Sequence, residues 1–301
     1  MHDIIIVGGG PAGLTAAIYG LRAGKSVLVI EKNGFGGQIA YSPKVENIPG
    51  TISISGAEFA DKLTEQAMNL GADVELETVI RVENGDIKRV YTEEGSCFEG
   101  KTVILAVGVK HRMLGLPGEE ELVGNGISFC AVCDGAFYAG QDVAMIGGGN
   151  SALQEALLLS EVCKKVTIVQ NLAFLTGEKK LADALAEKDN VEVIFSTVVA
   201  GYEAENGELK ALQLRNEETG ATSRIAVDGA FLAVGLQPEN EPFAALAGLN
   251  DWGYFDSGED CRTATEGLFV AGDCRSKRIR QVVTAAGDGA IAAMAACRYL
   301  D

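Results

Sequence analysis

One short pattern, an apolar run followed by a glycine-rich loop and a helical stretch, occurs twice in this chain and constrains its fold most. The first copy reads DIIIVG into GGGPAG, and the second reads DVAMIG into GGGNSA. A further apolar run closes each copy, SVLVIE in the first and VTIVQ in the second. Strand, glycine loop, helix and strand in this order form a βαβ unit with parallel strands. We therefore predict an α/β protein with two Rossmann-like dinucleotide-binding domains.

The first copy carries each part that dinucleotide binding requires. Gly8, Gly10 and Gly13 give the G-x-G-x-x-G spacing, and Glu31 ends the second run, 23 residues beyond Gly8. The glycines let backbone N–H groups and a helix N-terminus meet a pyrophosphate, and the acid accepts hydrogen bonds from ribose hydroxyls. Because both strands and the acid accompany the glycines, this loop predicts a nucleotide site.

The second copy is less complete. Gly147, Gly149 and Ala152 take the three glycine positions, and the neutral Gln170 lies where the acid is expected. This loop could still hold a pyrophosphate. It could equally be kept for helix–strand packing after an internal duplication, and both readings stay open at this point.

Length, charge and apolar runs narrow the class of protein. The 301 residues are 47% hydrophobic and 22% charged, which fits a two-domain globular chain. A net charge of −17 argues against nucleic acid and anionic membranes as partners. The first apolar run begins at Ile4, leaving no room for a signal peptide, and no run approaches the ~18 apolar residues of a membrane span. We expect a cytoplasmic protein.

The seven cysteines point to redox chemistry rather than to a metal. Only Cys130 and Cys133 are closely spaced, in CAVCDG. One CxxC without a second pair, beside only His2 and His111, does not match a zinc or iron–sulfur ligand set, so no metal site is predicted. Two cysteines at this spacing can close a small disulfide ring, and either sulfur can then resolve a mixed disulfide.

Two Gly- and Pro-bearing stretches divide the chain. MLGLPGEEE begins at Met113, and LQPENEP follows the second copy. The simplest layout makes residues 1–113 and 238–301 one domain and inserts residues 114–237 as the second. The inserted domain then carries both the CxxC and the second glycine loop.

Motifs along essentially the whole chain resemble the low-molecular-weight thioredoxin reductases. They are GGGPAG with Glu31, GGQ, ENIPG, CAVCDG, GGGNSA, and AGD followed by RQVVTAAGDG. The resemblance implies an FAD domain built from the first and last segments, and a central domain that normally holds a nicotinamide coenzyme. It also implies a homodimer with thioredoxin as its substrate. The residues implied to bind FAD are Gly8, Gly10, Pro11, Ala12, Gly13, Glu31, Lys32, Gly37, Gln38, Asn47, Gly272, Asp273, Arg280, Gln281 and Val282.

The resemblance also implies roles for individual residues. Gln38 and Asn47 would lie near the isoalloxazine, Asp273 would bind the ribityl chain, and the Gln281–Val282 backbone would meet the pyrimidine end of the flavin. In the redox motif Cys133 would face the flavin and Cys130 would exchange with the partner disulfide. Asp134 would serve as the acid and base for thiol protonation.

One departure from the family bears on the electron donor. NADPH-dependent members carry three arginines after the second strand, which clamp the 2′-phosphate. Here the run is QNLAFLT, so Gln170, Asn171, Leu172 and Thr176 fill this stretch. An NADH site would want an acid at its start, and Gln170 is neutral. In this respect the chain resembles ferredoxin-dependent flavin thioredoxin reductases.

The expected electron path therefore runs from reduced ferredoxin through FAD and the Cys130–Cys133 pair to thioredoxin. Ferredoxins near −400 mV and thioredoxin near −270 mV differ by roughly 130 mV, about 6 kcal/mol for two electrons. One basic run, Arg275, Lys277, Arg278 and Arg280, could dock an acidic ferredoxin, or could hold FAD phosphates or lie in solvent. An NAD(P)H-dependent reductase with atypical coenzyme contacts and a non-catalytic flavin-binding sensor remain the alternatives.

Overall fold

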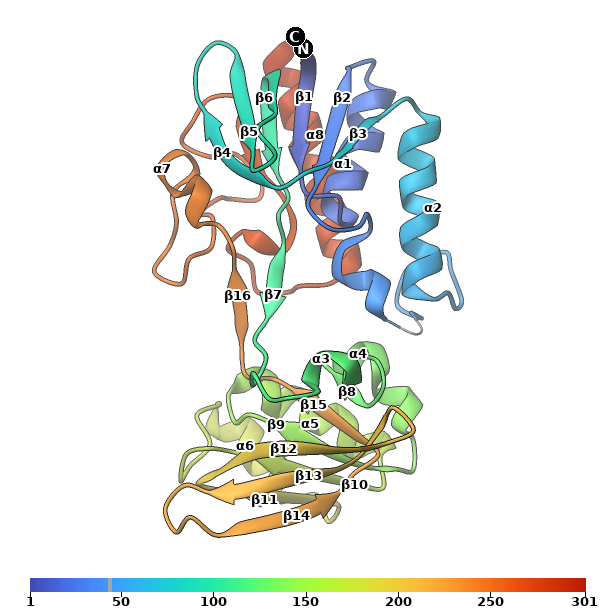
Figure 1. The fold of residues 1–301 in the computed structure, drawn as a ribbon, viewed down its shortest axis with the longest axis vertical. Helices are drawn as coiled ribbons and strands as arrows, with labels where there is room; N and C mark the ends of the chain where they lie inside the picture. The colour runs from blue at the N-terminus through green and yellow to red at the C-terminus, as the bar shows by residue number, and fades with distance from the viewer. Residues whose placement is uncertain (43–44) are drawn as a thin grey trace. The chain divides into compact units, whose positions relative to one another are not determined.

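The computed structural model describes residues 1–42 and 45–301, which divide into two compact units (Figure 1). Unit 1 comprises residues 1–42, Ile48–Lys110 and Gln237–Asp301, and unit 2 comprises residues 45–47 and His111–Leu236. Unit 2 is thus formed mainly by one segment that interrupts unit 1. The expected crossings at 113/114 and 237/238 lie within three residues of the observed ones at 110/111 and 236/237.

Unit 1 is built around one sheet with helices on it. Its elements are β1 (His2–Val7), α1 (Pro11–Arg22), β2 (Val27–Glu31), η1 (Gly37–Tyr41), α2 (Gly56–Asn69), β3 (Asp73–Leu76), β4 (Val79–Glu83), β5 (Lys88–Thr92), β6 (Cys97–Leu105), η3 (Glu241–Phe243), α7 (Ala244–Ala247), β17 (Leu268–Val270), η4 (Gly272–Cys274) and α8 (Val282–Leu300). The sheet has the order β3-β2-β1-β6-β5-β4, and β17 pairs with β6.

Alternation along β1 explains the layers of unit 1. Ile4 and Ile6 pack with α1 and α8 in one buried cluster, while Ile5 and Val7 pack with Phe243 and Phe255 in the other. Successive strand side chains point to opposite faces of a sheet, so an unbroken apolar run is the mark of a strand that is buried on both faces. The parallel pairing of β1 with β2 and with β6 follows from the predicted βαβ unit.

Unit 2 repeats this plan and adds an antiparallel layer. Its elements are α3 (Glu119–Leu122), β8 (Ile127–Ser128), α4 (Ala131–Asp134), η2 (Gly135–Tyr138), β9 (Asp142–Ile146), α5 (Asn150–Val162), β10 (Lys165–Val169), α6 (Lys179–Ala186), β11 (Val191–Ile194), β12 (Thr197–Glu205), β13 (Glu208–Asn216), β14 (Thr222–Ala226) and β15 (Gly229–Leu232). The parallel sheet has the order β11-β10-β9-β15-β8, and β12-β13-β14 form a second sheet.

The same alternation separates the two faces of the parallel sheet in unit 2. Val143 and Met145 of β9 pack with α5, whereas Ala144 and Ile146 pack with the leucines of β13. Helices therefore cover one face, and the antiparallel sheet covers the other. The predicted fold class, two Rossmann-like domains with the second inserted into the first, is confirmed.

The two segments that join the units pair with each other. β7 (Val109–His111) and β16 (Leu236–Pro238) form a two-stranded sheet. Just beyond β7 the chain is fixed to unit 2 by the buried Glu119, whose carboxylate accepts the N–H groups of Leu114, Gly115 and Leu116. The hydroxyl of Tyr202 donates to the same carboxylate at 2.8 Å. Residues 114–116 therefore belong rigidly to unit 2.

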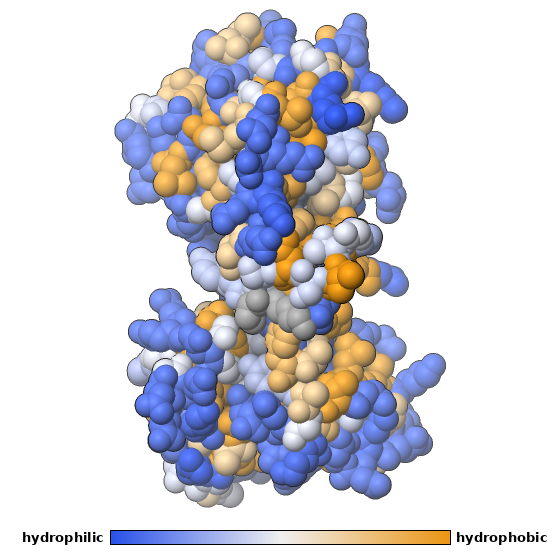
Figure 2. All heavy atoms as spheres, turned by 90° about the vertical axis from the view of Figure 1, so that its right-hand side faces the viewer, coloured by the Kyte–Doolittle hydropathy of each residue, from blue (hydrophilic) through white to orange (hydrophobic). Residues whose placement is uncertain are grey.

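Hydropathy of the helices bears on whether a described helix could span a membrane. The face drawn in Figure 2 carries mostly hydrophilic side chains, mixed with smaller apolar areas. In the part of the chain that the structure describes, every helix is too short or too polar to cross a bilayer.

Of the readings left open for the basic run, ferredoxin docking does not fit Arg275 and Lys277, because both side chains are less than a tenth exposed. The Arg275 guanidinium donates a hydrogen bond to each oxygen of Asp288 at 2.8 Å, and the Lys277 ammonium lies 2.9 Å from Asp288 Oδ2. All three side chains are less than a tenth exposed. Arg280 stacks on Tyr254, which leaves Arg278 as the exposed cation of the four.

Asp288 is the centre of this network. Burial alone would raise its pKa, but the hydrogen bonds from Arg275 and Lys277 outweigh burial and hold the pKa of Asp288 below its ordinary value. Its Oδ2 also accepts the N–H of Gly272 at 3.1 Å. The carboxylate thereby links α8 to the turn that follows β17.

Replacing Asp288 with alanine should lower the free energy of unfolding by about 3–5 kcal/mol, because the buried Arg275 and Lys277 lose the carboxylate with which both pair. Denaturant unfolding, followed by circular dichroism at neutral pH, measures the change. Asp301→Ala removes an exposed partner of Lys25 and serves as the control, with little expected change. Equal midpoints for the two variants would contradict the role given to Asp288.

Candidate active site

The first glycine loop brings backbone against backbone at the end of β1. Gly8 has φ 109°, and a Cβ built on it would lie 2.3 Å from the carbonyl oxygen of Ala106. A Cβ on Gly13 would lie 1.8 Å from the oxygen of Gly8, so α1 can begin this close to β1 only with glycine there. A Cβ on Gly10 would make only an ordinary van der Waals contact, 3.9 Å from Gly37 Cα. Pro11 begins α1 and Ala12 follows it.

The acid at the end of β2 is turned toward this loop. Glu31 Oε2 accepts the N–H of Gly9 at 2.7 Å, and its Oε1 accepts the N–H of Asn33 at 3.0 Å. The neighbouring Lys32 forms an ion pair with Glu239, which also pairs with Lys110 at 2.8 Å.

Asp273 lies at the other edge of the loop, in the turn between β17 and α8. Burial raises the pKa of Asp273 to about 6, against the lowering effect of Lys277 and Arg280. Within the described residues its buried Oδ1 has no hydrogen-bond partner, which is the state expected of a group reserved for a ligand hydroxyl. Gly272, with φ 82°, would place a Cβ 2.8 Å from that of Ala12, so this turn touches α1.

The remaining residues predicted to bind the flavin do not all lie in unit 1. Gln281 caps α8 by a reciprocal bond with Thr284, and Val282 is its first residue. Gln38, one residue after Gly37 in η1, donates its side-chain amide to Val109 O. The exposed Asn47 groups with unit 2 instead, so the structure does not bring it into unit 1 with the others. The cradle of glycines, the turned acid and the unpartnered Asp273 oxygen fit FAD.

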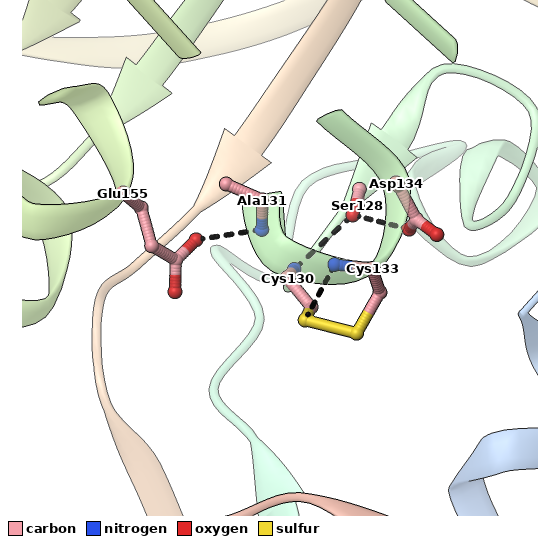
Figure 3. The surroundings of a disulfide bond; sticks show 6 residues. All are labelled: Ser128, Cys130, Ala131, Cys133, Asp134 and Glu155. Atoms are coloured by element: carbon pink, nitrogen blue, oxygen red, sulfur yellow. Dashed lines mark hydrogen bonds between the residues drawn. A yellow bond between two sulfur atoms is a disulfide. The ribbon is translucent and has the colours of Figure 1, made fainter. Parts of the chain in front are cut away.

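Unit 2 holds the redox pair at the start of α4. Cys130 and Cys133 form a disulfide with a Cα–Cα distance of 5.3 Å (Figure 3). Cys130 is the N-cap of α4, and its sulfur accepts the N–H of Cys133 at 3.2 Å. The remaining cysteines are free in the structure, four of them buried and Cys97 exposed.

A short hydrogen-bond chain connects Asp134 to the pair. The Ser128 hydroxyl donates to Asp134 Oδ2 at 2.6 Å and accepts the N–H of Cys130 at 3.1 Å. Burial raises the pKa of Asp134, while the Ser128 hydrogen bond lowers it. Its other oxygen is buried and, among the described residues, has no partner. A carboxyl with a raised pKa is a candidate acid or base, and two hydrogen bonds connect this one to the backbone N–H of Cys130.

Two residues beside the pair were missed by sequence reasoning. Ser128 ends β8, and a lone serine before CAVCDG carries no signal. Glu155 lies on α5 and accepts the N–H of Ala131, inside the redox motif, at 3.0 Å (Figure 3). Glu155 lies 24 residues from Ala131 along the chain, and that separation hides its contact with the redox motif from sequence reasoning.

The second glycine loop has the backbone of the first but not its acid. Gly147 has φ 126°, and a Cβ on it would lie 2.6 Å from the oxygen of Ala233. Gln170 is buried and donates its side-chain amide to Phe174 O at 3.0 Å. A Cβ on Gly148 would lie 2.6 Å from Gln170 Cδ, so this amide packs directly under the loop.

The segment after β10 folds back onto this loop. The N–H groups of Thr176 and Gly177 both donate to Gly148 O, at 2.8 and 3.0 Å. Asn171, Leu172 and Thr176 are exposed, and residues 171–177 contain no charged side chain. The loop is intact in outline, and the run of residues 170–177 supplies neither a cation nor a carboxylate to it.

Ser128→Ala should raise the pKa of Asp134 further, because it removes a hydrogen bond that lowers this pKa. A carbon-13 NMR titration of the aspartate carboxyls measures the shift. Ser160→Ala, which removes a hydroxyl bonded to Leu157 O, is the matched control and should leave Asp134 unchanged. A pKa that stays fixed or falls in Ser128→Ala would show that the hydroxyl does not act on Asp134.

Comparison with known proteins agrees with this geometry. The pyridine nucleotide-disulphide oxidoreductase family model matches residues 2–289. The chain is 38% identical to thioredoxin reductase from Bacillus subtilis over 301 residues, covering 100% of this chain and 95% of that one. It is also 38% identical to the 34.2 kDa protein in rubredoxin operon of Clostridium pasteurianum, covering 99% and 97%.

A solved structure leads to the same family. Thioredoxin reductase from Streptococcus pyogenes aligns with a TM-score of 0.93 at 40% identity, covering 100% of this chain and 98% of that one. The match extends over both glycine loops and the disulfide motif alike. The chain therefore belongs to the low-molecular-weight thioredoxin reductases, the FAD-using flavin disulfide oxidoreductases of the pyridine nucleotide-disulphide oxidoreductase family.

Proposed function

We propose that this enzyme reduces thioredoxin with electrons from reduced ferredoxin, delivered through FAD and the Cys130–Cys133 pair, and not from NADPH or NADH. One observation carries the choice of donor. At the end of β10, where a coenzyme ribose would be read, the chain places a buried Gln170 and an uncharged segment, 171–177.

The physical argument concerns the 2′ position of the adenosine ribose. A 2′-phosphate needs guanidinium groups, each charge-assisted hydrogen bond contributing about 1.5–3 kcal/mol, and a free 2′-hydroxyl needs a carboxylate. Gln170 supplies neither, because its amide is spent on Phe174 O. Losing two such contacts corresponds to roughly 100-fold or more in coenzyme affinity.

FAD belongs to unit 1 in this proposal. The N–H groups of the Gly8–Gly13 loop and the N-terminus of α1 would hold its pyrophosphate, Glu31 its ribose and Asp273 its ribityl chain. Bound FAD would supply a carrier that accepts single electrons and passes on a pair. Gln38 and the start of α8 at Val282 would line the flavin ring.

The dithiol performs the second half-reaction. The Cys130 thiolate attacks the thioredoxin disulfide, forming a mixed disulfide and releasing one thioredoxin thiolate, which takes a proton. Cys133 then attacks Cys130, releases the second thioredoxin thiol and restores the ring. Asp134, with its pKa raised by burial and its link through Ser128, is placed to hold and return the proton.

Two observations bear on the alternatives. The intact second loop, with no side-chain cap on the N-terminus of α5, favours an NAD(P)H-dependent reductase with atypical contacts. The joint presence of nucleophile, resolving thiol and raised-pKa carboxyl disfavours a non-catalytic sensor. Since Arg275 and Lys277 are buried, ferredoxin docking is not assigned to that run. A homodimer in the cytoplasm is part of the same proposal, by family resemblance.

Anaerobic stopped-flow measurement should distinguish the donors. Reduced ferredoxin should bleach the flavin at a rate that supports turnover, and NADPH and NADH should bleach it at least ~100-fold more slowly. Dithionite serves as the control for a reducible flavin. Bleaching by either nicotinamide coenzyme as fast as turnover would refute the ferredoxin assignment.

Cys133→Ser should trap thioredoxin as a stable mixed disulfide through Cys130, because the resolving sulfur is gone. Mass spectrometry of the proteolysed adduct identifies the cysteine. Cys130→Ser, which keeps Cys133, is the matched control and should trap far less. Linkage through Cys133 in that control, at equal yield, would reverse the assigned roles.

A further inference from the structure

Glu155 is a partly buried carboxyl that the reaction described above does not use. It lies on α5, whose Ala156 and Leu159 belong to the same apolar cluster as Ala131. Burial raises its pKa to about 7, with a further raising effect from Asp134, against the lowering effect of its hydrogen bond to Ala131. In the part of the chain that the structure describes, no ion pair involves it. A carboxyl is costly in such a place unless its oxygen has a specific partner.

Its partner is the amide at the middle of the redox motif. Glu155 Oε2 accepts the N–H of Ala131, the first residue of α4, at 3.0 Å. Figure 3 shows the carboxylate reaching this amide from one side of the motif, while Ser128 and Asp134 lie on the other side. Ala131 follows Cys130 directly, so the bond fixes the peptide that carries the attacking sulfur.

Three successive hydrogen bonds thus define the conformation of the motif. The N–H of Cys130 goes to Ser128 Oγ at 3.1 Å, that of Ala131 goes to Glu155, and that of Cys133 goes to Cys130 Sγ at 3.2 Å. The last bond is made inside the ring, where the N–H of Cys133 also lies 3.2 Å from Cys130 O, whereas the first two are made by side chains outside the ring. Those two can persist when the ring opens.

We propose that Glu155 is a positioning residue of the dithiol: its oxygen holds the Ala131 amide, and thereby keeps Cys130 within reach of Cys133 in both redox states. This rests on the proposed redox role of the pair. In the reduced protein the two thiols then meet at high effective concentration, which favours closing of the ring and release of reduced thioredoxin. Closure forms the Cys130–Cys133 bond, breaks the mixed disulfide and returns the electron pair to the thioredoxin sulfur.

Two conservative variants distinguish the effect of side-chain length at position 155 from the effect of its charge. Glu155→Gln keeps an oxygen at the same distance and loses the charge, and Glu155→Asp keeps the charge but is one methylene too short. The equilibrium between the Cys130–Cys133 disulfide and dithiothreitol, read by thiol alkylation and mass spectrometry, needs neither ferredoxin nor thioredoxin. The result therefore does not depend on which electron donor the enzyme uses. Glu161→Asp, an exposed carboxylate on the same helix, is the matched control.

We expect Glu155→Asp to shift the equilibrium about tenfold toward the dithiol, since a buried N–H loses its acceptor and the motif loosens. Glu155→Gln and Glu161→Asp should stay within about twofold of the parent protein. The reduced Glu155→Asp enzyme should also turn over thioredoxin disulfide about tenfold more slowly. An unshifted Glu155→Asp, or a Glu155→Gln shifted as far as Glu155→Asp, would overturn the proposal. A lower unfolding midpoint with an unshifted thiol equilibrium would likewise leave Glu155 merely structural.

Discussion

Close approach of two backbone segments at the end of a central strand is the constraint on which both halves of this molecule depend. A Cβ on Gly8 would strike Ala106 O, and a Cβ on Gly147 would strike Ala233 O. In each half the strand that supplies this oxygen, β6 or β15, is the parallel neighbour of the first strand. The glycine therefore decides where the loop turns and where the following helix begins. The glycine loop of unit 1 and the glycine loop of unit 2 both follow from this close packing of backbone on backbone.

The two copies diverge in the residues around this shared backbone. In unit 1 the carboxylate of Glu31 accepts a hydrogen bond from the loop amide of Gly9. In unit 2 the corresponding Gln170 packs its amide under Gly148 and bonds Phe174. The second loop thus keeps the backbone of the first, with a neutral side chain in place of its acid. What unit 2 adds instead is the disulfide motif, held by Ser128 and Glu155 from two different elements.

The local parts of this structure could be read from the sequence because their signals are local. Apolar runs, glycine spacing and the Cys130–Cys133 pair each lie within a few dozen residues, and the fold class they predict is confirmed. The basic run stayed open at the level of sequence because its surroundings depend on Asp288, a carboxylate in the next helix that pairs with Arg275 and Lys277 inside the protein. Glu155 was missed for a similar reason: nothing in LQEALLL indicates which amide its side chain will meet. The roles assigned to the flavin residues and to Asp134 stay predictions.

Equilibrium binding of the coenzymes tests the central claim most directly, since it examines the second glycine loop without any electron transfer. Calorimetric titration of the oxidised holoenzyme with NADPH and with NADH should give no saturable heat up to about 1 mM, a binding free energy weaker than about −4 kcal/mol. Saturable binding of either coenzyme in the micromolar range would contradict the account, because the uncharged segment after β10 would then suffice to recognise it.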